Sequence, residues 1–238
     1  LGVMVPDAQI SGVGFAFKDY NAVWSAMDGD LGTYVRNRIN ATPLFAFEKM
    51  FDGGFRQITT STRQVKQPGD LKDLKIRVPS SPLWTSVFAA FGASPTTLSL
   101  EEVYSALQTH VVDGEENPLV LIDTTRFYEV QKYCALSNHM WDGFWFLGNK
   151  ANFQKLPPDL QEIVMRNINA AALAERADVK ALDDSLLTQL KGKGLQFNDV
   201  DKDAFRDQLR HAGFYADWKK RLGDGLWAKL EQYSGRIA

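Results

Sequence analysis

The chain has 238 residues, 45% of them hydrophobic, and its 27 Lys and Arg nearly balance 29 Asp and Glu, giving a net charge of -2. This is an ordinary globular composition for one large or two small domains, without the basic excess of a nucleic-acid-binding protein. The single cysteine, Cys134, excludes an internal disulfide and a cysteine-based metal cluster. No apolar run approaches the roughly 20 residues of a membrane-spanning helix, so we expect no membrane insertion.

The first part of the chain predicts one strand and two short helices. Leu1–Val5 has the pattern of a buried strand, and because no signal peptide precedes it, we expect an N-terminal segment to be missing. Asp19 can cap a helix that runs to Met27 with apolar residues on one face. After a break at Asp28–Asp30, a second amphipathic helix is expected over Leu31–Ile39.

Two more strands are predicted next, with a glycine pair between them. Leu44–Phe47 is apolar, whereas Phe55–Thr60 has no clean apolar face. Gly53–Gly54 therefore reads either as a tight turn or as a hinge.

The stretch 70–118 predicts strand, helix, strand, helix, strand and helix, the order of a parallel α/β layer. Leu74–Val78 alternates apolar and basic residues, which is typical of a short strand with one buried face. The expected strands are 74–78, 93–98 and 111–112, and the expected helices begin at Ser81, Ser99 and Pro118.

Arg77 is the first candidate binding residue. It stands at the carboxyl end of a predicted strand, just before Ser81 and Pro82, which have the types expected at a helix N-cap and first turn. Ligands bind at this edge of open α/β sheets, and a guanidinium can hold a carboxylate with two hydrogen bonds. The alternative is a structural ion pair with one of the chain's own acids.

The second half of the chain is dominated by a long helical pattern over 157–190. As one helix it would be roughly 45 to 50 Å long, so it is either kinked or laid across two domains. Before it come a strand at Tyr133–Ser137 and the aromatic segment 141–146; after it come a short strand and helices at 201–211 and 215–233.

Motifs for chemistry are absent from the sequence. The three histidines are too far apart for a local metal motif, and there is no P-loop, GxSxG elbow or GxGxxG motif. Cys134 lies in an apolar strand pattern and is expected to be a buried, inert thiol. Glu115 and Glu116 are interpreted as solvated loop charges and not as an acid–base pair. Nothing here supports an enzyme.

Five sequence blocks resemble the solute-binding subunits of TRAP transporters, the tripartite ATP-independent periplasmic carriers of organic acids, in the DctP-type family. The blocks are Leu71–Pro79, Phe91–Pro95, Glu102–Thr109, Val112–Pro118 and Phe127–Tyr133. The resemblance implies an α/β fold, a two-lobed clamp like other periplasmic binding proteins, with discontinuous domains and a long kinked helix spanning both. By analogy, 1–54 plus 143–182 form lobe I and 55–142 plus 183–238 form lobe II, with C-terminal helices packing across the lobes.

The function that the resemblance implies is capture of a small carboxylate in the periplasm and delivery to TRAP membrane permease subunits. The ligand would be a sugar acid, a hydroxy acid or a C4-dicarboxylate, and the aromatic segment 141–146 favours a hydroxylated monocarboxylate. The protein would act as a monomer without a chemical step, a cofactor or nucleic acid. An organic-acid enzyme and a carboxylate-sensing domain on the same fold stay open as alternatives.

The resemblance also assigns binding residues. It makes Arg77 the carboxylate clamp, assisted by Arg56. The other residues that it places near the ligand are Asn117, Ser80, Leu100, Trp141, Asp142 and Phe144. A metal ion is not expected, because the Glu-Trp pair of the metal-assisted 2-oxo acid subgroup is replaced by Glu116 and Asn117.

Overall fold

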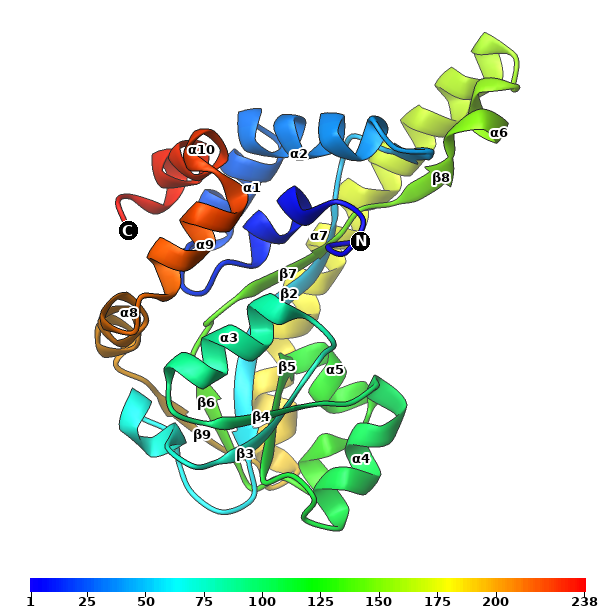
Figure 1. Ribbon diagram of the computed structural model, residues 1–238. Coiled ribbons are helices and arrows are strands. Elements are labelled where there is room, and N and C mark those ends of the chain that lie inside the picture. Colours follow the sequence, from blue (N-terminus) through cyan, green and yellow to red (C-terminus); the bar gives the residue numbers. More distant parts are fainter.

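The computed structural model describes residues 1–238 and shows a mixed α/β protein crossed by one long helix (Figure 1). The strands are β1 (Leu44–Ala46), β2 (Phe51–Thr60), β3 (Lys75–Val78), β4 (Ser94–Thr97), β5 (Gly114–Pro118), β6 (Tyr133–Leu136), β7 (Trp141–Phe144), β8 (Leu147–Asn149) and β9 (Gln196–Asp199). The α-helices are α1 (Tyr20–Met27), α2 (Asp30–Asn40), α3 (Pro82–Ala90), α4 (Leu100–Gln108), α5 (Leu119–Thr124), α6 (Lys150–Gln154), α7 (Pro158–Gly192), α8 (Lys202–His211), α9 (Phe214–Leu222) and α10 (Asp224–Ser234). The 3-10 helices are η1 (Pro6–Gly12), η2 (Pro68–Leu71) and η3 (Phe127–Glu129).

The main sheet has seven strands in the order β4-β3-β5-β2-β6-β9, with β7 paired to β2 outside this path. β3 runs parallel to β4 and β5, and β6 parallel to β9, but β2 runs antiparallel to β5, β6 and β7. β3, β4 and β5 thus form the parallel layer expected for 70–118, and β2 joins this layer as an antiparallel strand. Residues 54–60 of β2 are all buried, which explains why this strand shows no apolar and polar alternation.

The glycine pair lies inside β2, so the tight-turn interpretation is wrong. The pairing of β2 with β7 shifts register between Asp52 and Gly54. Gly54 has a φ of 96°, a conformation that side chains disfavour. A Cβ at Gly53 would come within 2.7 Å of the backbone oxygen of Asp142 on β7. Glycine is therefore required for this irregular, close pairing of the two strands.

Three other predicted elements differ from the structure. Leu1–Val5 forms a turn and not a strand: the N–H groups of Met4 and Val5 donate to the Leu1 carbonyl, and Val3 is 93% exposed. No neighbouring strand pairs with this segment, so its apolar pattern alone does not make it extended. The short strand expected at 111–112 begins instead at Gly114. The last expected helix is divided into α9 and α10 at Gly223, whose φ is 87°.

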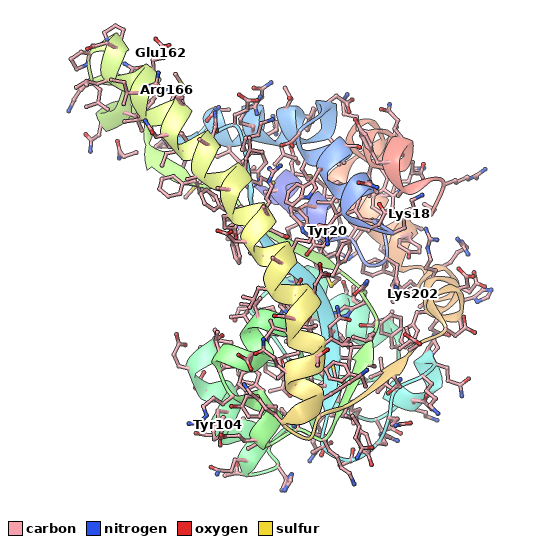
Figure 2. All side chains as sticks on the ribbon, turned by 180° about the vertical axis from the view of Figure 1, so that it is seen from behind. Lys18, Tyr20, Tyr104, Glu162, Arg166 and Lys202 are labelled. Carbon is pink, nitrogen blue, oxygen red and sulfur yellow. The ribbon has the colours of Figure 1, made fainter.

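Helix α7 is continuous over 35 residues, which corresponds to about 52 Å. Figure 2 shows it running along the back of the molecule, from the projecting end near Glu162 and Arg166 down to the sheet. It packs against β2 and α5. One uninterrupted helix thus joins the two ends of the molecule.

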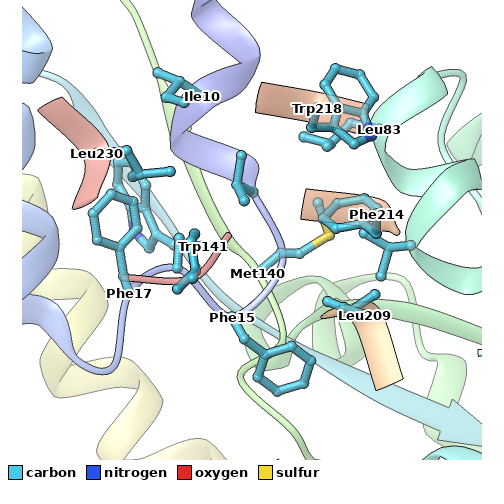
Figure 3. Close-up of a cluster of buried hydrophobic side chains, with 14 of the residues drawn as sticks. Ile10, Phe15, Phe17, Leu83, Met140, Trp141, Leu209, Phe214, Trp218 and Leu230 are labelled. Carbon is cyan, nitrogen blue, oxygen red and sulfur yellow. The ribbon is translucent and has the colours of Figure 1, made fainter. Parts of the chain in front are cut away.

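The larger hydrophobic core brings together segments from both ends of the chain. Figure 3 shows Phe15 and Phe17 near the N-terminus, Leu83 on α3 and residues of α8, α9 and α10 in one cluster. Helix α10 packs on α1 and α2, while α8 and α9 pack on α3. The C-terminal helices therefore hold α3 against the N-terminal helices.

Arg176 attaches α7 to the N-terminal helices. Its guanidinium donates to both oxygens of Asp28, at 2.8 and 3.1 Å, and to the carbonyl of Met50 at 2.9 Å. It also lies 3.7 Å from the ring centroid of Trp24. This buried group thus makes ionic, backbone and cation–π contacts at one point.

We predict that Arg176→Met lowers the free energy of unfolding by about 2 kcal/mol, because the charge of Asp28 loses its main partner. The value is below that of a fully buried pair, since Asp28 is 27% exposed and Lys49 also contacts it. Urea unfolding measures the change. Arg166→Met, at an exposed position of the same helix, is the control and should be neutral. Equal stability of the two variants would contradict the prediction.

Candidate functional site

A buried ion-pair cluster lies where β2, β5 and β7 meet. Arg56 of β2 donates from Nε to Glu116 Oε2 at 2.5 Å and from Nη1 to Asp142 Oδ2 at 2.6 Å. Its Nη2 donates to Asn117 Oδ1 at 3.0 Å. Burial lowers the pKa of Arg56, but Glu116 and Asp142 outweigh this effect and raise it above its ordinary value. Arg56 is therefore a fully paired cation.

Glu116 connects this cluster to a buried histidine. His139 Nε2 is 3.0 Å from Glu116 Oε2, and its Nδ1 is 2.8 Å from the hydroxyl of Ser137. Burial lowers the pKa of His139, so the ring is neutral and its Nε2–H donates to the carboxylate. Burial favours the neutral form of Glu116, but Arg56 and His139 outweigh it and keep the pKa of Glu116 low. Ser137 and His139 are fully buried, so this row of groups cannot reach a substrate.

Glu115 points away from Glu116 to its own polar partners. Its carboxylate accepts from Thr59 Oγ1 and Asn117 Nδ2, both at 2.5 Å, and burial raises its pKa to about 7. The interpretation of both glutamates as solvated loop charges is wrong, because both are fully buried in β5. Their distant partners, on β2 and between β6 and β7, lie far away in the sequence, so no local pattern reveals them.

The hydrogen-bond partners of Arg77 differ from those of Arg56. It lies in β3 and donates from Nε and Nη2 to the carbonyl of Leu98, at 3.0 and 2.7 Å. Nη1 bonds no protein atom, and no acid lies within ion-pair distance. Burial lowers the pKa of Arg77, and Glu116 and Glu115 only partly oppose this effect. The alternative of an internal ion pair therefore applies to Arg56 and not to Arg77.

A cavity of about 610 Å³ lies between η1, the start of α3 and β7. Four of the predicted binding residues line it: Ser80, Trp141, Asp142 and Phe144. Trp84, Trp145 and Ser81 also line it and were missed. Phe144 is 53% exposed, whereas Trp141 is buried and donates its indole N–H to Asp52.

The other four predicted residues do not line this cavity. Arg56 lies directly behind its wall, since it bonds Asp142 and its guanidinium carbon is 5.6 Å from the ring centroid of Trp84. Asn117 is bound to Arg56 and Glu115 and has no free polar atom. Leu100 begins α4, two residues after the carbonyl that Arg77 binds. Arg77 stands three residues before the lining residue Ser80.

Comparison with known proteins identifies the family. Residues 1–216 match the DctP family, described as bacterial extracellular solute-binding protein, family 7. A solute-binding protein of Verminephrobacter eiseniae is 35% identical over 229 residues, which cover 96% of this chain and 67% of the relative. The 2,3-diketo-L-gulonate-binding periplasmic protein YiaO of Escherichia coli is 31% identical over 205 residues, 86% of this chain and 62% of that protein. Other relatives are named for binding sialic acid or C4-dicarboxylates.

A solved structure shows the same fold over the whole chain. The TRAP periplasmic solute-binding protein from Polaromonas sp JS666, bound to D-erythronate, superposes with a TM-score of 0.91 at 28% identity. The match covers 100% of this chain and 77% of that one. The chain thus spans 62 to 77% of the length of these three proteins.

The fold and the cavity define the class of periplasmic solute-binding proteins, which bind and do not transform their ligands. The chain belongs to the DctP family of TRAP solute-binding proteins. The predicted family, the α/β fold class and the assignment as a binding protein are therefore confirmed. None of the helices is long and apolar enough to cross a membrane.

We predict that the stability of the protein falls as pH rises from about 4.5 to 7, partly because Glu115 must ionise while buried. The unfolded state loses this proton near its ordinary pKa, whereas the folded state holds it up to about 7. A shift of this size corresponds to about 3 kcal/mol. In Glu115→Gln this contribution disappears, so the melting temperature should fall less between pH 5 and pH 8.

The measurement is a series of thermal melts of both proteins across this pH range. Glu101→Gln, at an exposed position of α4, is the matched control and should keep the slope of the unsubstituted protein. If Glu115→Gln keeps that slope too, the carboxyl group does not titrate in this window.

Proposed function

We propose that this chain captures a small organic carboxylate in the cavity between η1, α3 and β7 and delivers it to TRAP permease subunits. The observation that carries the proposal is the state of Arg77. It is a buried guanidinium without an acid partner, and its Nη1 has no bond within the protein. A carboxylate would supply the charge that the protein itself does not.

The N-terminus of α3 supports an anion at the same place. Ser81 is the N-cap residue, but its side chain caps no backbone N–H. Both Ser80 and Ser81 line the cavity, so the positive end of the helix dipole faces it. Free N–H groups at a helix start favour a carboxylate. Arg77, at the end of the preceding strand, adds a full positive charge to this partial one.

Arg56 has a different role in the proposal. Glu116 and Asp142 already neutralise it, so a ligand would have to compete with two acids for the same donors. Arg56 instead fixes Asp142 in the cavity wall, and Asn117 in turn holds Arg56. These two predicted residues act as positioning residues behind the wall.

Closure of two lobes supplies the remaining binding energy. A micromolar ligand requires about 8 kcal/mol, whereas one charge-assisted hydrogen bond contributes only about 1.5 to 3 kcal/mol. In the proposed division, 1–54 with 143–182 moves against 55–142 with 183–238. The hinge would be the irregular glycine pairing of β2 with β7, and closure would bury the ligand against Trp84, Trp141 and Phe144.

We predict that Arg77→Ala weakens binding by about 2 to 5 kcal/mol, because a carboxylate would stay buried without its cation. Arg77→Lys should also bind poorly, since an ammonium cannot bond both the Leu98 carbonyl and the ligand in the same fork geometry. A thermal-shift screen of organic acids first identifies a ligand, and calorimetry then compares the variants.

Lys75→Ala is the matched control, because Lys75 is exposed on the same strand. It should bind like the unsubstituted protein. If both Arg77 variants also keep their affinity, Arg77 does not hold the carboxylate. If no acid of a broad panel binds the protein at all, the proposed function is wrong.

A further inference from the structure

The cavity wall has an unusual charge. It is lined by 17 residues, and among their side chains only that of Asp142 is charged. Asp142 is 23% exposed, and only its Oδ2 is bonded within the protein, to Arg56. The other oxygen, Oδ1, accepts no hydrogen bond from the protein. The side chains of the wall therefore present one free anionic acceptor and no cationic group.

The cluster behind the wall does not neutralise this charge. One guanidinium, Arg56, faces the two carboxylates of Glu116 and Asp142, and the neutral His139 adds no charge. The cluster thus carries a net charge of about -1 by this count, since one cation cannot balance two anions. Arg77 is the one further cation beside the cluster, and a single ligand carboxylate would use it. A second ligand carboxylate would meet the uncompensated negative charge.

Uncharged donors in the same wall are without partners. The hydroxyls of Ser80 and Ser81 line the cavity and make no hydrogen bond within the protein. They are free to bond a ligand, so a ligand that supplies acceptors suits this wall. Hydroxyl groups suit this wall because each can accept from a donor and also donate to Asp142.

Resting on the proposed function, we infer that Asp142 makes the cavity selective for hydroxylated monocarboxylates and against dicarboxylates. Its free oxygen accepts a hydroxyl proton of the ligand, and its charge repels a second carboxylate. Arg56 acts through Asp142, because it holds this side chain in the wall. The selectivity thus comes from a side chain that carries the same negative charge as the ligand's own carboxylate.

Matched acid pairs test this inference without any substitution. D-Erythronate and meso-tartrate differ only in the oxidation of one terminal hydroxymethyl group to a carboxylate, and the same holds for D-galactonate and galactarate. We expect the protein to bind at least one monoacid at least tenfold more tightly than its diacid, by calorimetry. Equal or tighter binding of the diacid, or binding of succinate but of neither monoacid, overturns the inference and leaves carboxylate binding intact.

Asp142→Asn then tests the residue itself. Asparagine keeps an oxygen for Arg56 but removes the negative charge, so the preference for the monoacid should fall about tenfold, mainly through tighter binding of the diacid. Asp178→Asn, at an exposed position of α7, should leave the preference unchanged. An unchanged preference in folded Asp142→Asn overturns the role of Asp142. Failure of the protein to bind any carboxylate refutes both this inference and the proposed function.

Discussion

The ion pair of Arg56 with Glu116 and Asp142 is the interaction on which the site depends. It joins β2, β5 and β7 where the three strands meet, and its Arg56 and Glu116 are almost completely buried. Burying such charges is expensive, and apolar residues of similar size often stabilise a fold as well or better. The cluster is therefore better understood as a positioning device than as a source of stability. It fixes a carboxylate in the cavity wall with one oxygen still free.

Arg56 and Arg77, 21 positions apart, thus have different roles because their surroundings differ. Arg56 is neutralised by acids of two other strands, so it is rigid and unavailable. Arg77 is held by a backbone carbonyl, which fixes the side chain but supplies no negative charge. A guanidinium held in this way is pre-organised, because little of its freedom remains to be lost when an anion binds. The difference between the two arginines comes from their hydrogen-bond partners, since the residue type is the same.

The sequence predicted what depends on local signals. Alternation located β3, Ser81 with Pro82 located the start of α3, and the Ser99 and Glu102 capping box located α4. Arg77 was placed correctly beside a helix N-terminus for the same reason. The two glutamates of β5 were misread, because polar residues in a short strand look like a loop until partners about 60 and 23 positions away are known. The resemblance to a family supplied the long-range arrangement that local patterns lack. The strand predicted at Leu1–Val5 was wrong for the opposite reason. Its apolar pattern is present, but no neighbouring strand pairs with it.

The position of Asp142 relative to the proposed hinge explains how fixed and moving parts share the cavity. Asp142 is bonded to Arg56 on β2. Gly143 and Gly53 lie at the irregular part of the pairing between β7 and β2. In the proposed division, Phe144 and Trp145 lie beyond this point and move with the other lobe. Asp142 would then stay in the same lobe as Arg77, while Phe144 and Trp145 close over the ligand. A ligand with an unbalanced charge would oppose closure, because removing water strengthens repulsion as much as attraction. Selectivity and closure would therefore be two results of the same electrostatic arrangement.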